Sequence, residues 1–445
     1  MSTKQNQIQD RDSFRSKWGF ILACIGSAVG MGNIWLFPYR MATYGGTFLL
    51  IYLLFDVLIG FSGVVGEMTF GRAARSGPVG AFRQACASRG HGKLGALIGG
   101  IPMVGALSLA IGYSVVVGWI FKYTFGAFTG SVLSPASPDE FGAAFGATAS
   151  AFGNNFWLIF ALIVTFIIMV LGISAGIEKA NKLMIPLFYA LFIGLAVYVA
   201  FQPGAADGYK WMFTVDPEKL KDPMLYVYAL GQSFFSLSLA GTGTVVYGSY
   251  LKKDQDIPQS ARTIALFDTL AALLAAFVIM PAVFAYGLDP ASGPPLMFIT
   301  MPEVFKQMPG GSVFMIIFFA AVLFAALTSL VNLFETPVEA LQTFFGMNRV
   351  KAVAIVAVIG TVVGVCIEGI VSGWMDICSI YLCPLGALMA GVMIFWVCGG
   401  KYAKEKAEEG ASRPLGKWFV PAGKFIFCGV TLFVLIMGIA WGGIG

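Results

Sequence analysis

The sequence predicts an all-α polytopic membrane protein with eleven transmembrane helices, in which helices 1–5 and 6–10 form a 5+5 inverted repeat and helices 1 and 6 are broken. Composition is the first observation behind this. Of the 445 residues 58% are hydrophobic and 11% charged, whereas a soluble domain carries about 25% charged residues. The second is a series of apolar stretches, each of the roughly 20 residues needed to cross a ~30 Å hydrocarbon layer. The third is a pair of glycine-rich interruptions, five segments apart.

The apolar stretches define the elements in order. The expected spans are 17–42, 46–71, 94–126, 152–172, 176–203, 223–252, 260–288, 312–345, 349–372, 375–398 and 418–444. The polar N-terminus does not have the pattern of a cleavable signal peptide. The expected organisation is a cytoplasmic tail (1–16), a first repeat (17–203), a second repeat (223–398) and an additional helix (418–445).

Basic residues set the orientation. With the N-terminus in the cytoplasm, 22 of the 28 Lys and Arg fall on the cytoplasmic side. This asymmetry agrees with the positive-inside rule. Eleven spans then place the C-terminus outside. The net charge of +5 is explained by topology, and we expect no nucleic-acid partner.

The first interruption lies in the middle of the first span. Gly26, Gly30 and Gly32 fall within seven residues, and the amide Asn33 follows at membrane depth. Each glycine weakens a helix by about 1 kcal/mol relative to alanine. Broken backbone inside a bilayer is tolerated only where it lines a cavity or is covered by protein.

The second interruption repeats the pattern in the sixth span, through hydroxyl residues and glycines between Ser236 and Thr244, including Gly241. One alternative is a close-packing helix face, since small residues let membrane helices approach. Interrupted segments at corresponding positions of two halves instead indicate a transporter site. Unwound carbonyls can bind a cation, and half-helix N-termini can bind a carboxylate.

The motif from Gly26 to Pro38, GSAVGMGNIWLFP, resembles the neurotransmitter:sodium symporter family, bacterial amino-acid branch. The likeness continues through residues 39–46, Glu67 with 71–72, 231–238 and 325–329, and covers essentially the whole chain. The resemblance implies sodium-coupled symport of an amino acid in the bacterial inner (cytoplasmic) membrane.

The family implies two sodium ions. The first would be held by the Ala28 carbonyl, by Asn33, Ser236 and Asp268, and by the substrate carboxylate. The second would be held by the carbonyls of Gly26, Val29 and Ala325 and the hydroxyls of Thr328 and Ser329. Hard oxygen ligands suit an alkali cation. Thr328 and Ser329 could instead bond the carbonyl one turn back in their own helix.

The family also implies a substrate pocket and gates. Tyr113 would donate to the substrate carboxylate, and Phe235 would form a lid, although both could be packing aromatics. The expected substrate-binding residues are Ala28, Gly32, Leu109, Tyr113, Phe235, Ser236, Ser238, Thr242, Ser329 and Leu333. Gly176 and Pro186 match a Gly-X9-Pro motif whose unwinding in the fifth span opens a cytoplasmic water path, and Asp376 matches an outer-gate acid.

Intramembrane acids are functional candidates by default, although a purely structural role is the alternative. Related sequences usually have Asn where this chain has Asp268. A fixed carboxylate supplies the negative charge itself, so chloride is not expected as a cofactor. Glu67 is expected to brace the first span, and Glu335, just before Pro337, to bond freed backbone.

The outer gate departs from the family, because Leu36 replaces the usual Arg, and Arg40 lies one turn further out. An acid for the inner gate opposite Arg11 is not evident. Near Gly241, a small residue replaces a pocket aromatic and favours a bulky substrate.

The expected function is sodium-coupled import of a neutral, hydrophobic or aromatic amino acid by alternating access. The alternatives are a sodium-independent or proton-coupled exchanger of the same fold and a non-transporting membrane sensor. We expect no enzyme activity, since no clustered acid/base or metal set is evident. The expected partners are the amino-acid substrate and the lipid bilayer, and the expected state is a monomer or a weak dimer.

Overall fold

The computed structural model describes residues 13–239, 242–288 and 296–441. Across these three ranges the chain is helical and has no β-strand. Within them, seven helices are long and apolar enough to cross a membrane, or up to eight if a bent first pair counts as one span. The seven are Gly46–Ala74, Gly92–Thr129, Ile173–Ala200, Ile257–Ala285, Gly311–Phe345, Arg349–Val397 and Phe419–Trp441.

Several long helices contain wider π-helical turns. The first of these helices consists of α4 (Gly46–Phe55), η2 (Asp56–Gly60) and α5 (Phe61–Ala74). The second consists of η4 (Ile173–Ile177) and α10 (Glu178–Ala200). The third consists of α21 (Phe419–Pro421), η11 (Ala422–Phe427) and α22 (Cys428–Trp441). The single-element helices are α7 (Gly92–Thr129), α9 (Asn155–Val170), α14 (Ile257–Ala285) and α16 (Gly311–Phe345). Shorter helices connect them: α6 (Pro78–Ala87), α8 (Pro138–Ala149), α11 (Ala205–Phe213), α15 (Met301–Gln307) and α20 (Gly400–Glu408).

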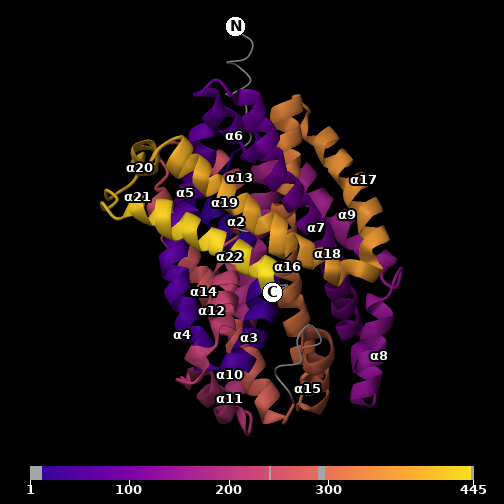
Figure 1. Ribbon diagram of the computed structural model, residues 1–445. Coiled ribbons are helices and arrows are strands. Elements are labelled where there is room, and N and C mark those ends of the chain that lie inside the picture. The colour runs from indigo at the N-terminus through magenta and orange to yellow at the C-terminus, as the bar shows by residue number, and fades with distance from the viewer. Residues whose placement is uncertain (1–12, 240–241, 289–295, 442–445) are drawn as a thin grey trace.

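The stretch 349–397 departs from the predicted boundaries. The sequence predicts two spans there, and the chain forms one helical run of 49 residues. At 1.5 Å per residue this run is far longer than one bilayer crossing. α17 (Arg349–Ile367) and α19 (Cys383–Val392) leave α18 (Val371–Ile377) in different directions, as Figure 1 shows. The number of crossings stays a prediction.

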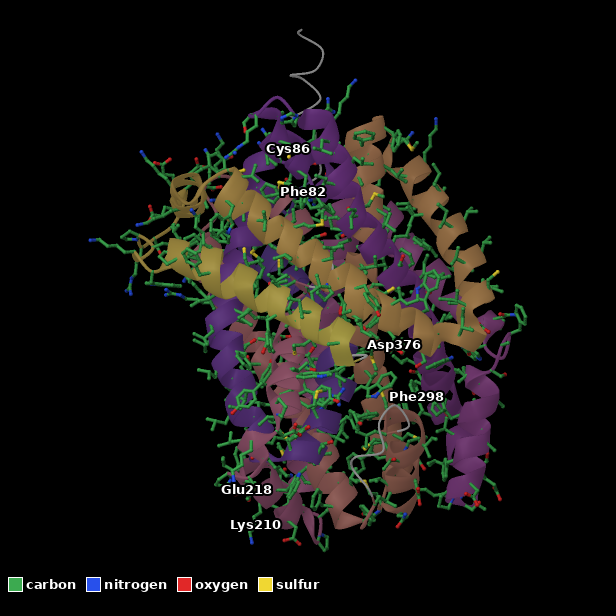
Figure 2. The ribbon with its side chains drawn as sticks, viewed as in Figure 1. Phe82, Cys86, Lys210, Glu218, Phe298 and Asp376 are labelled. Atoms are coloured by element: carbon green, nitrogen blue, oxygen red, sulfur yellow. The ribbon has the colours of Figure 1, made fainter. Side chains whose placement is uncertain are left out.

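The connections sort to two ends of the molecule. α6 lies at one end, and α8, α11 and α15 lie at the other (Figure 1). The labelled side chains follow the same division in Figure 2, with Phe82 and Cys86 near one end and Lys210 and Glu218 at the other. Large apolar side chains on the long helices, among them Val57 and Leu97, are exposed, as expected of helices that face lipid.

The first predicted interruption falls on a real bend. α2 (Lys17–Ala28) begins at the N-cap Ser16, whose hydroxyl accepts from the Gly19 amide at 2.9 Å. It ends at Ala28, and η1 (Gly32–Leu36) and α3 (Phe37–Tyr44) continue at an angle of 52°. Residues 29–31 therefore link two helical segments across the bend.

The second predicted interruption also separates two helices. α12 (Pro223–Ser236) ends where the motif begins, and α13 (Gly243–Ser249) starts at the last glycine of the motif. Ser238 and Thr242 have positive φ angles of 56° and 49°, a left-handed conformation uncommon for residues other than glycine. Gly241 lies outside the described residues.

Candidate functional site

The two interruptions lie next to each other and are surrounded by other helices. α2 packs against α10, α14 and α16, and α13 packs against α2, α5 and α16. Residues far apart in sequence therefore surround the bend after Ala28. Two groups of polar side chains and one cavity lie here.

The first polar cluster consists of Asn33, Ser236 and Asp268, which come from three helices and are each at most 1% exposed. Asn33 Nδ2 donates to Ser236 Oγ at 3.0 Å and to Asp268 Oδ1 at 2.8 Å. Ser236 Oγ donates to Asp268 Oδ2 at 2.5 Å. Three side chains predicted as ligands of one ion are therefore in mutual contact, and one of them, Asp268, is a carboxylate.

The Asn33 amide is orientated by the interruption itself. Its Oδ1 accepts from the Gly30 amide at 3.0 Å, and its nitrogen faces the acid. Next to this group, Gln232 Nε2 donates to the Gly32 carbonyl at 2.8 Å. Side chains thus satisfy backbone groups that the broken helix frees, which buried polar groups require.

A second buried acid lies close to the first polar cluster and was missed by sequence reasoning. Asp56 is 5% exposed and accepts from the Thr269 hydroxyl at 2.9 Å, one residue after Asp268. An acid within the apolar run YLLFDVLIG was the available signal, because intramembrane carboxylates are rare.

The second polar cluster consists of Gly26, Val29, Thr328 and Ser329. Ser329 Oγ lies 3.2 Å from the Gly26 carbonyl oxygen and 3.0 Å from that of Val29, and it also reaches the Ser27 carbonyl at 3.1 Å. The Ser27 carbonyl also accepts from the Ser238 hydroxyl at 2.8 Å, so the single Ser329 hydrogen is left for the carbonyls of Gly26 and Val29. The remaining lone pairs are available to a cation.

Thr328 makes the alternative contact predicted for it. Its hydroxyl donates within its own helix, 3.0 Å from the Phe324 carbonyl oxygen and 2.9 Å from that of Ala325. Its Cβ nevertheless lies beside Gly26, because a methyl group added to Gly26 would meet it at 3.0 Å. The five residues predicted for the second ion are therefore neighbours, with the Thr328 hydroxyl turned toward its own helix.

A cavity lies between the two polar clusters. Eight of the ten predicted substrate residues line it: Ala28, Gly32, Leu109, Tyr113, Phe235, Ser238, Ser329 and Leu333. Tyr113 Oη accepts from the Met31 amide at 3.2 Å. The cavity therefore has a polar wall at the bend and apolar side chains elsewhere.

The other two predicted residues lie beside the cavity rather than on its wall. Ser236 belongs to the first polar cluster, and Thr242 takes its left-handed conformation just before Gly243. Five lining residues were missed: Ser27, Gly30, Met31, Gly243 and Asn332. Asn332 is 1% exposed and donates to the Ser27 hydroxyl. An amide three residues after Ser329, at membrane depth, was its signal.

The predicted gating residues are spread over the structure. Asp376 is exposed and lies near the end of α22 in Figure 2. Arg40 stacks on the ring of Tyr228 with its guanidinium carbon 3.6 Å from the ring centre. Gly176 lies in η4, and Pro186 lies in α10. Arg11 is outside the described residues.

Two further acids have different partners from those predicted. Glu67 accepts from the Thr244 hydroxyl and so braces the sixth segment rather than the first. Glu335 forms a paired contact with Arg349, at 2.9 and 2.7 Å, and accepts from the Tyr250 hydroxyl at 2.7 Å, so it does not serve freed backbone. Both corrections have one cause, which is that an unpaired buried carboxylate is unfavourable and takes the nearest donor.

Comparisons with known proteins agree with this geometry. The model of a family described as the sodium:neurotransmitter symporter family matches residues 11–136 and 146–441. The chain is 38% identical over 322 residues to YhdH of Bacillus subtilis, an uncharacterized sodium-dependent transporter, covering 72% of this chain and 70% of that protein. It is 31% identical over 440 residues to an uncharacterized sodium-dependent transporter of Methanocaldococcus jannaschii, covering 92% and 87%.

A solved structure is also similar. The crystal structure of MhsT in complex with L-phenylalanine superposes with a TM-score of 0.85 at 34% identity and covers 96% of this chain and 99% of that one. The likeness spans nearly the whole chain, including both interruptions and the helices around the cavity.

Proposed function

Because the chain belongs to the sodium:neurotransmitter symporter family, we propose that it imports a neutral amino acid with a hydrophobic or aromatic side chain by sodium-coupled alternating access. The observation that carries the proposal is the position of one cavity between two oxygen-rich clusters at the bend after Ala28. An amino acid in that cavity would touch Ser329 of the second cluster and would lie beside Gly32 and Phe235, the chain neighbours of Asn33 and Ser236 in the first cluster.

Two sodium ions would bind with the substrate. The first would lie at Asn33, Ser236, Asp268 and the Ala28 carbonyl, and the second at Ser329, Thr328 and the carbonyls of Gly26, Val29 and Ala325. Asn33 Oδ1 accepts one hydrogen bond, from the Gly30 amide, and its second lone pair would face the ion. An inward sodium ion contributes about 2.3 kcal/mol per 100 mV of membrane potential, so two ions can drive substantial accumulation.

The substrate would be held by its charged end and its side chain separately. Its carboxylate would lie near the Tyr113 hydroxyl and the amides at the bend, and its side chain would lie among Leu109, Phe235 and Leu333. MhsT in complex with L-phenylalanine supports an aromatic amino acid as the first substrate to test.

The finer topology belongs to the same proposal. Eleven spans, with 17–203 and 223–398 as inverted repeats and 418–445 as an additional helix, would place the N-terminus in the cytoplasm and the C-terminus outside. Helical segments overlap all eleven predicted ranges, which supports this count. The protein would work as a monomer or a weak dimer in the bacterial inner membrane.

Chloride would not be required. Asp268 is buried in the first polar cluster, where its negative charge can balance a bound cation without an external anion. Transport in which gluconate replaces chloride tests this directly.

Uptake of labelled phenylalanine into proteoliposomes tests the whole proposal. We expect saturable accumulation driven by an inward sodium gradient, inhibited by an excess of hydrophobic and aromatic amino acids among the twenty. Uptake that persists unchanged when choline replaces sodium would identify an exchanger. Binding without accumulation would identify a sensor.

A further inference from the structure

Asn181 carries a buried oxygen that has no partner, in the fifth helical stretch between Gly176 and Pro186. The side chain is 1% exposed, and its Nδ2 donates to the Ile177 carbonyl at 2.8 Å. Its Oδ1 has no hydrogen-bond partner. A buried amide oxygen without a donor is unfavourable, so Asn181 Oδ1 is a candidate to coordinate a bound ion.

The unpartnered oxygen is aimed at the second polar cluster. A methyl group added to Gly26 would meet Asn181 Oδ1 at 1.9 Å and Thr328 Cβ at 3.0 Å. Asn181 Oδ1 and Thr328 therefore flank the same point of α2. The Gly26 carbonyl oxygen also lies 3.2 Å from Ser329 Oγ. Side-chain oxygen from α10 thus adjoins the group proposed for the second sodium ion.

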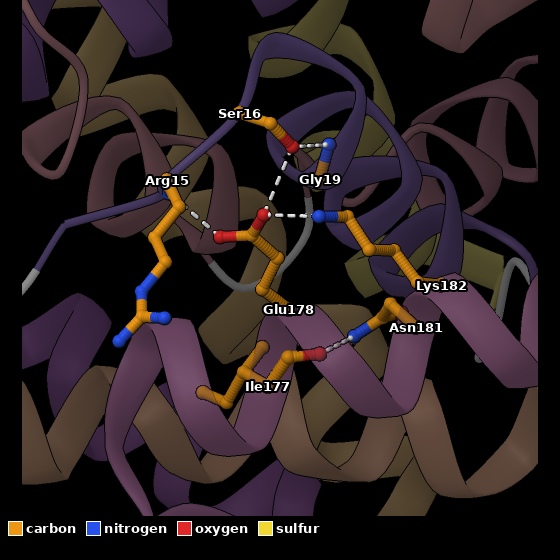
Figure 3. A network of polar contacts seen from close by, with 7 residues as sticks. All are labelled: Arg15, Ser16, Gly19, Ile177, Glu178, Asn181 and Lys182. Carbon is orange, nitrogen blue, oxygen red and sulfur yellow. Dashed lines mark hydrogen bonds and ion pairs between the residues drawn. The ribbon is translucent and has the colours of Figure 1, made fainter.

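Asn181 also adjoins a polar clasp, defined as Arg15, Ser16, Glu178 and Lys182 (Figure 3). Glu178 is 1% exposed and accepts from the Arg15 amide at 2.7 Å and from Ser16 Oγ at 2.9 Å, while Lys182 Nζ lies 2.6 Å from it. The clasp ties the start of α2 to the start of α10. Asn181 therefore lies between the clasp and Gly26, on the side of the second cluster that is nearer to the start of α2.

The helical backbone is irregular just before Asn181. η4 (Ile173–Ile177) is π-helical and follows Gly172, whose φ is +90°. The Nδ2 of Asn181 is bonded to the last carbonyl of that turn. A change of register there would move Asn181 Oδ1 relative to Gly26, because side chain and turn are linked by one hydrogen bond.

We propose that Asn181 Oδ1 is an oxygen contact for the second sodium ion as it leaves toward the cytoplasm. This inference rests on the proposed sodium-coupled function. An ion leaving the carbonyls of Gly26 and Val29 exchanges them for the amide oxygen of Asn181 before it reaches water. Oxygen is the ligand that hard cations prefer, and a neutral amide releases the ion more readily than a carboxylate.

Two substitutions at one position test the inference in proteoliposomes. Asn181→Ala removes the oxygen, and we expect sodium-driven uptake to slow by about fivefold, the effect of losing one polar contact, with little change in the half-saturating sodium concentration for substrate binding. Asn181→Asp is isosteric and adds a charge. We expect it to lower that sodium concentration by about tenfold and to slow uptake as well.

Thr431→Val is the matched control. Thr431 is buried and donates to a carbonyl four residues back, as Asn181 does, but lies on α22. Uptake and sodium dependence within about twofold of the wild type for both Asn181 variants would overturn the inference. A raised half-saturating sodium concentration in Asn181→Asp would also overturn it. A wild-type protein that binds and transports without sodium would overturn the proposed function, which separates the two failures.

Discussion

The first polar cluster, Asn33, Ser236 and Asp268, contains a carboxylate, whereas the second, Gly26, Val29, Thr328 and Ser329, contains only neutral oxygens. The two also differ in their surroundings, since the second adjoins Asn181 and the clasp at the start of α10. Coulomb attraction to a full charge is far stronger than attraction to a dipole in a low-dielectric interior. An ion at the first cluster should therefore be retained, and an ion at the second should be the one released.

The largest effect should follow from removing the negative charge of Asp268, which distinguishes the first cluster from the second. Asp268→Asn leaves the cluster without a carboxylate, and we expect uptake in chloride-free gluconate buffer to fall by about a hundredfold or more. Chloride should restore part of the loss, because an external anion can then supply the charge. Uptake of labelled substrate in the two buffers measures both effects.

Asp139→Asn, at the exposed first turn of α8, is the matched control and should leave uptake unchanged. Wild-type uptake that collapses in gluconate would contradict the role given to Asp268. A variant that transports equally well in both buffers would show that the clusters do not differ in charge.

The second cluster should respond in sodium affinity rather than in anion dependence. Ser329→Ala removes the hydroxyl that lies within 3.2 Å of three carbonyl oxygens. We expect the half-saturating sodium concentration for substrate binding to rise by about tenfold. Ser114→Ala removes a buried hydroxyl bonded only to its own helix and should have no such effect. If Ser329→Ala became dependent on chloride, the proposed difference between the clusters would be wrong.

The clasp should influence release by a smaller factor. Glu178→Gln weakens the ion pair with Lys182, which is half-exposed, and partly exposed pairs contribute little. We expect Cys24, which is buried in α2, to be alkylated about threefold faster, in a background where the other six cysteines are replaced. Faster alkylation reports a looser start of α2.

Glu405→Gln breaks the same kind of i, i+4 Lys–Glu pair on the exposed helix α20 and serves as the control. Unchanged alkylation of Cys24 in Glu178→Gln would show that the clasp does not restrain α2. A change of equal size in both variants would point to a general loss of stability.

How far these regions could be predicted differs between them. Glycines with polar neighbours predicted both interruptions, because local sequence determines whether a helix can continue. Asp268 and Asn33 were predicted by resemblance as ligands of the same sodium ion, and Asn33 Nδ2 lies 2.8 Å from Asp268 Oδ1. The Asp268 charge and the intramembrane position of Asn33 are properties of single residues, so the sequence alone displays them.

Contacts between distant helices were not predictable in the same way. Asn181 has an ordinary bond to its own helix, and its unpartnered oxygen becomes visible only when α10 is packed on α2. Glu67 and Glu335 were assigned the wrong partners because Thr244 and Arg349 come close only through the crossing of α5 with α13 and the turn into α17. Crossing geometry is set by many side chains together, and no single motif encodes it.

The smallest effect should come from Thr328, and it tests the ranking inside the second cluster. Its hydroxyl donates to the carbonyls of Phe324 and Ala325 in its own helix, whereas the Ser329 hydroxyl reaches the carbonyls of α2, so Thr328 should contribute less to an ion there. We expect Thr328→Val to raise the half-saturating sodium concentration by about twofold, less than Ser329→Ala, with Thr165→Val, which loses a similar bond within α9, as the control. An increase larger than that of Ser329→Ala would mean that Thr328 turns toward the ion when sodium binds, and that the second cluster rearranges more than the first.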